Sequence, residues 1–232
     1  MSEPRRLGVL GGTFDPIHLG HLDAGDAAQA ALDLDEVRLI PAHDPPHRPV
    51  DPRASAFHRF ALVSLAIADR PSWRVSDAEV SRQGPSYSVD TLRALHAEGW
   101  QPSQIFFILG ADAFAEIATW REFPAVLDGA HFAVIARPGT TIEDALSRTP
   151  ELRPRARQVG APIDARDSTA ILLIEARTRD VSSTLLRARL AAQQPVDDLV
   201  PAAVARHIAA NDLYRAPLES NLHGDSEIAQ GT

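Results

Sequence analysis

Two histidines near the N-terminus follow a glycine pair at a spacing that suits anion binding. Gly11 and Gly12 end an apolar run, and His18 and His21 follow shortly after them. Paired glycines let the backbone approach a ligand closely, and the start of a helix presents free N–H groups and the positive end of its dipole. Histidines three residues apart share one helical face, so both imidazoles can donate to one phosphate. Gly20, between them, leaves room for a base or a sugar to lie against the helix.

A metal site is the competing interpretation of the same two histidines. Imidazoles at this spacing can also ligate a cation. However, no carboxylate obviously joins the pair, and the dipole at the start of a helix favours anions over cations. The sequence therefore favours an anion here, and it shows no dedicated metal cluster.

A second candidate anion site lies near the C-terminus, at Ser182, Ser183 and Thr184. Serines cap helices well, and the amides of a capped helix can face an anion. Arg187 comes four residues after Ser183 and therefore shares its helical face. An ordinary N-cap followed by a surface arginine is the alternative. The histidine motif upstream favours the anion site.

Composition restricts how such anions could be held. All 23 Lys+Arg positions are arginine, and cysteine is absent. These absences exclude disulfides, Cys-ligated metals, thiol nucleophiles, Schiff-base chemistry and the phosphate-binding loop that ends in Gly-Lys-Ser/Thr. An anionic substrate must therefore be held by arginine, histidine, backbone amides or a metal. The net charge of −8 argues against nucleic acid or an acidic membrane as a partner, although a local arginine cluster stays possible.

The elements that must position these residues alternate along the chain. Short apolar runs predict buried strands at Leu7–Leu10, Val37–Ile40, Trp73–Ser76, Ile105–Leu109, Phe132–Ala136 and Ile171–Ile174. Helical spacing between them predicts helices over about Ile17–Leu32, Ala54–Asp69 and Ser88–Glu98. Asp15 and Pro16 are expected to cap the first of these helices. The face expected from the three- and four-residue spacing of the second consists of Phe57, Phe60, Ala61, Ser64, Leu65 and Ala68. This alternation predicts a parallel sheet covered on both faces.

We therefore expect one Rossmann-like, doubly wound α/β domain over residues 1–215. Residues 183–215 should form a small helical C-terminal part, with helices at about Ser183–Ala192 and Asp197–Asn211. Residues 138–170 are expected to be a loosely structured connection, and the polar segment 216–232 a disordered tail. Ligands of such a sheet bind beyond the carboxyl ends of its strands, which is where the glycine pair lies.

The chain is expected to be cytoplasmic. Its longest apolar runs are far shorter than the roughly 20 residues of a membrane span. The first residues are basic but lack the apolar stretch of a secretory signal. A homo-oligomer is possible, but the sequence does not reveal one.

The two anion motifs together resemble the nucleotidyltransferase superfamily that carries a His-x-Gly-His motif. The segment Gly11–His21 matches its first signature, and Val181–Arg187 matches its C-terminal Ser-Ser-Thr-x-x-Arg element. Within that superfamily, further segments resemble the bacterial nicotinate-nucleotide adenylyltransferases. These are Pro45–Arg48, Gly84–Leu92, and Gly110–Asp112 with the downstream Trp120. The matches run in the expected order from about Leu7 to Tyr214, nearly the whole chain.

The resemblance implies adenylyl transfer from ATP to nicotinic acid mononucleotide, with release of pyrophosphate, in NAD biosynthesis. It implies attack in line without a covalent intermediate, with Mg²⁺ on the triphosphate as the cofactor. His18, His21 and Arg187 would be the catalytic residues. The residues implied for ATP binding are Gly11, Gly12, Thr13, Phe14, His18, His21, Gly110, Asp112, Ser182, Ser183, Thr184 and Arg187. Those implied for mononucleotide binding are Gly12, Thr13, Phe14, His47, Arg48, Ser88, Trp120 and Arg121.

Some positions depart from the family pattern. Arg48 stands where lysine is frequent, and Ser88 where threonine is common. Ala42 and Arg121 stand where some relatives carry asparagine and tyrosine. The changes at 48 and 88 keep the charge and the hydroxyl, whereas the other two replace the side chain's chemistry.

Other functions use the same fold. The acceptor could be nicotinamide mononucleotide or phosphopantetheine, or the reaction a cytidylyl transfer. A non-catalytic nucleotide-binding protein is a further alternative, although the complete set of His18, His21 and Arg187 speaks against it. A Rossmann dehydrogenase is excluded because the first loop reads Gly-Gly-Thr-Phe rather than Gly-x-Gly-x-x-Gly.

Overall fold

A computed structural model describes residues 5–46, 51–136, 142–159 and 169–215 of the chain. Within these residues, seven strands form one sheet in the order β3-β2-β1-β4-β5-β7-β6, and every neighbouring pair is parallel. The strands are β1 (Leu7–Gly12), β2 (Glu36–Pro41), β3 (Trp73–Val75), β4 (Ile105–Gly110), β5 (His131–Ile135), β6 (Ala156–Gln158) and β7 (Ile171–Ile174). The expected Rossmann-like, doubly wound parallel sheet is confirmed.

The order of the strands creates a crevice beside β1. From β1 the chain proceeds outward through β2 to β3, and it then returns to place β4 on the other side of β1. The loops that follow β1 and β4 therefore leave the sheet in opposite directions. A ligand site is expected where such loops part, at the carboxyl ends of these two strands.

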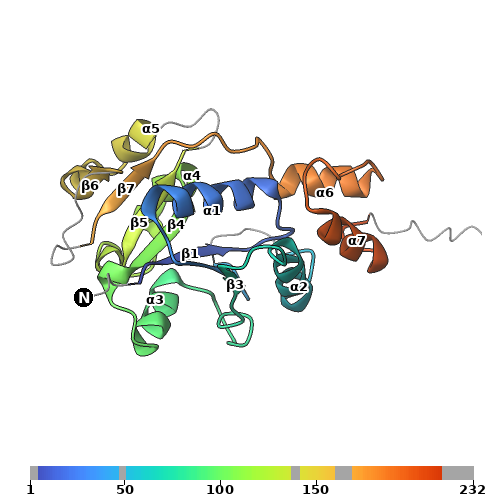
Figure 1. The fold of residues 1–232 in the computed structure, drawn as a ribbon, viewed down its shortest axis with the longest axis horizontal. Helices are drawn as coiled ribbons and strands as arrows, with labels where there is room; N and C mark the ends of the chain where they lie inside the picture. The colour runs from blue at the N-terminus through green and yellow to red at the C-terminus, as the bar shows by residue number, and fades with distance from the viewer. Residues whose placement is uncertain (1–4, 47–50, 137–141, 160–168, 216–232) are drawn as a thin grey trace, which may run out of the picture.

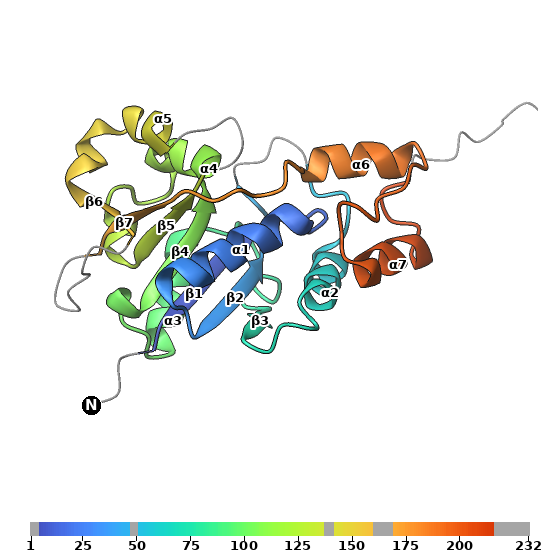
Figure 2. The ribbon, with the colours of Figure 1, turned by 45° about the horizontal axis from the view of Figure 1, so that its top comes forward.

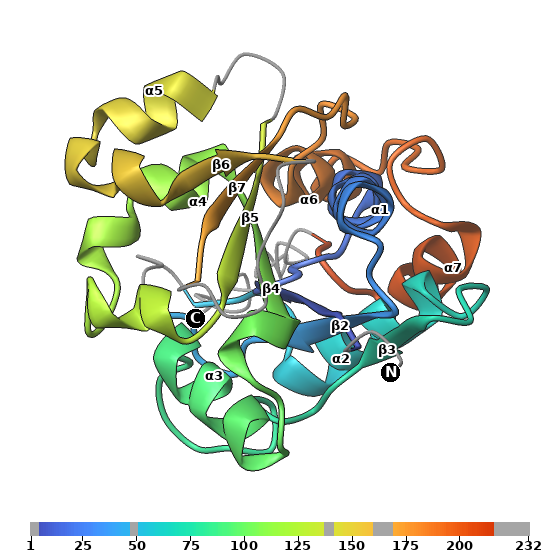
Figure 3. The ribbon, with the colours of Figure 1, turned by 60° about the vertical axis from the view of Figure 1, so that its left-hand side comes forward.

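Helices cover both faces of the sheet. They are α1 (Leu19–Leu32), α2 (Ala56–Ala66), α3 (Ser88–Ala97), α4 (Ala111–Ala115), α5 (Ile142–Ser147), α6 (Ser183–Ala191) and α7 (Ala202–Ala210). One apolar core joins the sheet to α1, α2, α6 and α7, and the other joins it to α3, α4 and α5. The strands need apolar residues on both faces for this arrangement, which is why their sequences are almost continuously apolar. The view in Figure 3 shows α1 on one side of the strands and α3 and α4 on the other.

The two C-terminal helices lie at the end of the molecule where β1 finishes and α1 begins (Figures 1 and 2). α7 packs against α2. The backbone N–H of Leu19, at the start of α1, donates to the carbonyl of Leu199 at 2.9 Å. Ser183 Oγ donates to the carbonyl of Pro16 at 3.0 Å. The C-terminal part is therefore attached to the loop that follows β1.

Several predicted boundaries are wrong. The segment 138–170 is not only a loose connection, because it contains α5, a 3-10 helix at Pro150–Arg155 and the edge strand β6. The helix expected at Asp197–Asn211 starts only at Ala202, since Pro201 supplies its N-cap. The short helix α4 was not predicted. The segment 216–232 lies outside the described residues, and the single domain over 1–215 stays a prediction.

The buried face of α2 also differs from the expected one. Its buried residues are Arg59, Leu62, Val63 and Ala66. Phe57, expected in the core, is 77% exposed. The helix is rotated relative to the prediction because Arg59 points inward, and no apolar pattern can reveal a buried arginine.

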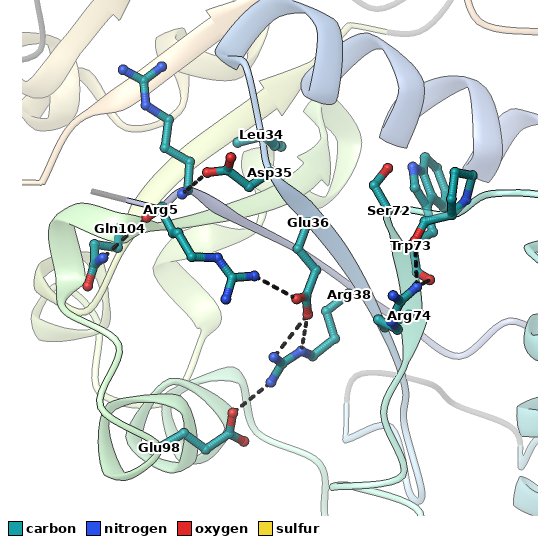
Figure 4. A network of polar contacts seen from close by, with 12 residues as sticks. Arg5, Leu34, Asp35, Glu36, Arg38, Ser72, Trp73, Arg74, Glu98 and Gln104 are labelled. Carbon is teal, nitrogen blue, oxygen red and sulfur yellow. Dashed lines mark hydrogen bonds and ion pairs between the residues drawn. The ribbon is translucent and has the colours of Figure 1, made fainter. Parts of the chain in front are cut away.

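A network of charged groups supports the sheet at the end opposite to the crevice (Figure 4). Arg38 of β2 pairs with Glu36 at 3.0 Å and with Glu98, which follows α3, at 2.7 Å. Arg5 also reaches Glu36, at 3.3 Å. Hydrogen bonds to two carboxylates raise the pKa of the Arg38 guanidinium, against the opposing effect of burial. The network therefore fixes the end of α3 to β2 and lies away from the candidate site.

Candidate active site

The carboxyl ends of β1 and β4 open onto a cavity of about 260 Å³. Its lining comes from the loops after β1 and β2, the segment before α3, the end of β4 and the turn after α4: Gly11, Gly12, Thr13, Ala42, Pro45, Pro46, Glu79, Ser86, Ser88, Thr91, Phe107, Leu109, Ala113 and Trp120. The lining combines apolar and aromatic side chains with hydroxyls and one carboxyl. Such a mixture suits a flat aromatic ring that carries a polar substituent.

Several residues proposed for mononucleotide binding meet at this cavity. Gly12, Thr13, Ser88 and Trp120 all line it. The Trp120 ring is half-buried and packs edge-on against Phe107, with ring centroids 5.8 Å apart. Trp120 is therefore held in place by the core while part of its surface stays available to a ligand.

Arg121 lies at a smaller adjoining cavity of about 50 Å³ that Ser86, Ser88 and Trp120 also line. Its guanidinium stacks over the Tyr87 ring at 4.7 Å from the centroid. Stacking of this kind orients an exposed arginine without neutralising it. His47 and Arg48, also proposed to bind the mononucleotide, lie outside the described residues.

The two histidines of the first motif stack on one another. Their ring centroids are 3.7 Å apart with an interplanar angle of 26°. His18 is the N-cap of α1, so Asp15 and Pro16 do not cap this helix as expected, and α1 begins at Leu19 rather than at Ile17. The His18 backbone N–H donates to His21 Nδ1 at 3.3 Å. Because Nδ1 accepts this bond, a neutral His21 carries its hydrogen on Nε2, which can donate to an anion.

The side chain of Phe14 supports this region from the core. Its ring is buried and packs edge-on against His21, with centroids 5.0 Å apart. A Cβ on Gly12 would lie 3.1 Å from the Phe14 ring, so only glycine lets the ring take this position without displacement. Gly12 thus leaves room for the Phe14 ring to pack beside His21.

Arg187 reaches from α6 to the same loop. Its Nη1 donates to the carbonyl of Asp15 at 2.8 Å, and its Nη2 donates to Thr184 Oγ1 at 3.2 Å. Ser182 caps α6, since its Oγ accepts from the N–H of Leu185 at 3.1 Å. The C-terminal motif is therefore brought to the histidine motif, although the two lie far apart in the sequence.

The buried carboxylate of Asp15 supports the contact between Arg187 and the loop after β1. Its carboxylate is 2% exposed and accepts backbone N–H bonds from Arg53 at 2.9 Å and from Ala54 at 3.1 Å. Its Oδ2 lies 3.9 Å from Arg187 Nη1. Tyr214 is buried beside it, and burial, with the charge of Asp15, raises the pKa of the Tyr214 hydroxyl above its ordinary value. Asp15 thus orients Arg187 and the start of the segment that leads into α2.

Arg59 is a residue that sequence reasoning missed. It is 1% exposed, and its guanidinium donates to the carbonyls of Ala54 (3.2 Å), Thr13 (2.7 Å), Ala42 (2.5 Å) and His43 (3.0 Å). These bonds satisfy a charge that would otherwise be costly to bury. One side chain therefore joins the loops after β1 and β2, which form adjacent walls of the cavity.

Glu79 is the second missed residue. It lines the cavity and is 7% exposed, and the Thr91 hydroxyl donates to its Oε1. Burial raises the pKa of the Glu79 carboxyl above its ordinary value of 4.5, while hydrogen bonds from Thr91 and Ser86 oppose the shift. Glu79 lies in the segment between β3 and α3, where the sequence shows no pattern that marks a buried carboxyl.

Gly20 has a different role from the expected one. A Cβ at this position would lie 3.0 Å from Val181 Cγ1, 3.2 Å from the carbonyl oxygen of Arg179 and 3.2 Å from His18 Nδ1. The space beside Gly20 is filled by protein, not left for a base or sugar. The missing side chain instead allows the segment before α6 to pack against α1.

The remaining proposed ATP residues lie at the end of β4 and in α4. Gly110 is the half-exposed N-cap of α4, and Asp112 is an exposed residue in the first turn of that helix. Across the described parts of the chain, no three His, Asp, Glu or Cys side chains gather as metal ligands. Of the helices seen in those parts, none combines the length and apolar composition that crossing a bilayer requires.

Comparisons with known proteins agree with this geometry. A family model described as cytidylyltransferase-like matches residues 9–189. A protein of Symbiobacterium thermophilum, named "Probable nicotinate-nucleotide adenylyltransferase", is 41% identical over 222 residues, which cover 95% of this chain and 99% of that protein. The chain belongs to this adenylyltransferase family. A relative of the same name from Chromobacterium violaceum is 42% identical over 212 residues, covering 90% of this chain and 99% of the relative.

Membership in this family makes the chain a nucleotidyltransferase. Solved structures support the fold. The nicotinic acid mononucleotide adenylyltransferase of Plasmodium falciparum, complexed with NaAD, has a TM-score of 0.67 and 18% identity, covering 91% of this chain and 98% of that one. A second structure of that protein, complexed with APC, has a TM-score of 0.64. At this identity the likeness concerns the fold alone.

Proposed function

We propose that the chain transfers the adenylyl group of ATP to nicotinic acid mononucleotide, giving nicotinic acid adenine dinucleotide and pyrophosphate in NAD biosynthesis. The observation that carries the proposal is the meeting of the two anion motifs beside one aromatic- and hydroxyl-lined cavity. The Asp15 carbonyl accepts a hydrogen bond from Arg187, and His18, three residues after Asp15, is the N-cap of α1. Cationic and N–H donors thus lie next to a pocket that fits a pyridine ring.

The chemistry needs positioning more than proton transfer. A phosphate oxygen of the mononucleotide attacks the α-phosphorus of ATP, a new P–O bond forms, and the bond to the bridging oxygen of pyrophosphate breaks. The attacking phosphate is already ionised near neutral pH, so no general base is required. The protein must hold two anions together and stabilise the charge that grows on the leaving group.

The donors divide naturally between the two parts of the triphosphate. His18 and His21 would bind the α-phosphate and its bridging oxygen, with His21 donating from Nε2. Arg187, with Ser182, Ser183 and Thr184 at the start of α6, would bind the β- and γ-phosphates. Removing one well-placed donor of this type typically costs about 10²–10³ in rate.

The mononucleotide would occupy the cavity. Trp120 would stack on the pyridine ring, and Ser88 with Arg121 would face its carboxylate. The backbone of Gly12 and Thr13 would lie between the two nucleotides, since it borders both the cavity and the histidines. His47 and Arg48 would act on the mononucleotide phosphate.

Mg²⁺ would enter as part of the substrate MgATP, held mainly by phosphate oxygens and water. Asp15 is 2% exposed and lies 3.9 Å from the Arg187 guanidinium, which makes it a poor metal ligand. The cytoplasmic location and the absence of nucleic-acid and membrane partners stay predictions from the sequence.

An acceptor panel tests the proposal. The purified chain would be incubated with ATP and Mg²⁺ and with nicotinic acid mononucleotide, nicotinamide mononucleotide or phosphopantetheine, and pyrophosphate release would be scored as kcat/KM. We expect the highest value with nicotinic acid mononucleotide. A higher value with another acceptor would move the assignment to that acceptor, and the absence of turnover with all three would leave a nucleotide-binding protein.

A further inference from the structure

Among the described residues that line the 260 Å³ cavity, Glu79 is the only ionisable one. The others are glycines, apolar or aromatic residues, and residues with hydroxyl groups. A charged group in such a cavity dominates its electrostatics, because the surrounding protein screens charge far less than water does. Glu79 is therefore the group inside the cavity whose protonation state can change the charge that the cavity accepts, and the Arg121 guanidinium lies at the adjoining smaller cavity.

The Glu79 carboxyl cannot move out of the cavity easily. The buried Thr91 hydroxyl donates to Oε1 from α3, and Ser86 binds the carboxyl from the segment before α3. Ser86 is fixed in turn, since its Oγ accepts the N–H of His43 at 2.9 Å and its own N–H donates to the carbonyl of Asp44 at 2.8 Å. The carboxyl is thus held between the two walls that Ser86 and Thr91 provide.

The proposed acceptor brings a second carboxylate into this space. Nicotinic acid mononucleotide carries an anionic ring substituent, whereas nicotinamide mononucleotide carries a neutral amide. An ionised Glu79 would repel the former and could accept an N–H from the latter. A protonated Glu79 would accommodate the carboxylate and donate an O–H bond to it.

We propose that Glu79 takes up one proton when the acid mononucleotide binds, and that selection of the acid over the amide is therefore pH-dependent. This inference rests on the proposed function and concerns the same site. The proton comes from solvent and joins the Glu79 carboxylate, and no other bond forms or breaks. Glu79 is a specificity-determining residue in this scheme and takes no part in adenylyl transfer itself.

The groups around Glu79 shift its carboxyl toward the protonated form. Burial is the main cause that raises the pKa of Glu79, and the charge of Asp90 on α3 adds to it. The Arg82 charge, on the same segment as Glu79, opposes the shift. His43, on the facing loop, binds the Val80 carbonyl through Nδ1 at 3.1 Å. The approach of a substrate carboxylate would raise the pKa further.

The test is the ratio of kcat/KM for the acid to kcat/KM for the amide, measured between pH 5.5 and 9. Both acceptors carry the same ribose and phosphate, so titration of the phosphate, His18 or His21 cancels in the ratio. In the wild type we expect the ratio to fall with rising pH, by up to about tenfold per unit once Glu79 is ionised in the free protein. In Glu79→Gln we expect a ratio that does not change with pH.

Thr91→Val is the matched second variant. It removes a hydrogen bond that favours ionised Glu79 but keeps the volume of the side chain. We expect the ratio of acid to amide kcat/KM to begin its fall at a higher pH than in the wild type. If circular dichroism shows that Glu79→Gln is unfolded, the pH dependence of Thr91→Val tests the inference instead.

Two results would overturn the inference while the proposed function stands. One is turnover of the acid with a wild-type ratio that is flat over the pH range. The other is a folded Glu79→Gln, or a Thr91→Val, with the pH dependence of the wild type. Absence of turnover with the acid at every pH would overturn the proposed function as well.

Discussion

Arg187→Ala should separate catalysis from stability. The structure gives Arg187 two hydrogen bonds, to the Asp15 carbonyl and to Thr184 Oγ1, and a side chain that is 17% exposed. Losing them should lower the free energy of unfolding by about 1–2 kcal/mol. For a chain of this size, that corresponds to a fall in Tm of about 2–8 °C.

The loss in rate should be larger than the loss in stability. Arg187 has five N–H donors, of which two are used by these bonds. The others can reach a triphosphate and bind the leaving pyrophosphate most strongly in the transition state. Removing such a donor should lower kcat/KM by about 10²–10³, or about 3–4 kcal/mol.

Steady-state kinetics with ATP, Mg²⁺ and nicotinic acid mononucleotide, combined with thermal melts, would measure both effects. Arg189→Ala is the control, because Arg189 lies two residues further along α6 and binds Asp198 at 3.0 Å instead of the loop after β1. It should keep kcat/KM within about twofold of the wild type. A kcat/KM for Arg187→Ala within threefold of the wild type, or an equal loss in Arg189→Ala, would refute the reasoning.

Three further predictions concern the scaffold. Gly20→Ala places a Cβ 3.0 Å from Val181 Cγ1, so we expect a Tm lower by about 2–8 °C and a kcat/KM lower by about tenfold; unchanged melts and kinetics would contradict this. Burial lowers the pKa of His131 below its ordinary value of 6.5, so the unfolded chain binds more protons than the folded chain does. The stability that neutral His131 allows is present above pH 6.5 and is lost as the pH falls toward the folded-state pKa. In urea titrations from pH 5 to 8, His131→Asn should remove part of that dependence, and equal slopes would exclude it. Arg38→Met removes the bonds to Glu36 and Glu98, and should lower the free energy of unfolding by about 1–2 kcal/mol with unchanged kcat/KM, measured by urea titration and turnover.

The parts of the fold that the sequence predicted well are those in which burial is apolar. The strands at the centre of the sheet are covered on both faces, so Ile105–Gly110 and Ile171–Ile174 carry continuous apolar runs. The edge strand Ala156–Gln158 lacks such a run, because one side of it has no neighbouring strand. The equally short edge strand Trp73–Val75 was predicted because it carries tryptophan and valine, whereas Ala156–Gln158 offers one alanine between polar residues and so leaves too weak a pattern to be recognised.

The site was predictable where a helix or a glycine fixes local geometry. His18 and His21 were expected to share one face, and their rings stack. Residues with buried charge could not be found in the same way. Arg59 and Glu79 are buried because partners distant in the sequence satisfy them, and only the tertiary structure brings those partners together.

The buried guanidinium of Arg59 couples the loop after β1 to the loop after β2. It holds the carbonyl of Thr13, beside the glycine pair, and the carbonyls of Ala42 and His43, beside the pyridine pocket. Neither loop can be displaced without straining bonds that also restrain the other. Substitutions on the two loops should therefore be non-additive in double-mutant cycles even where their side chains do not touch. An engineer who wished to retune one nucleotide subsite would have to expect a change in the other.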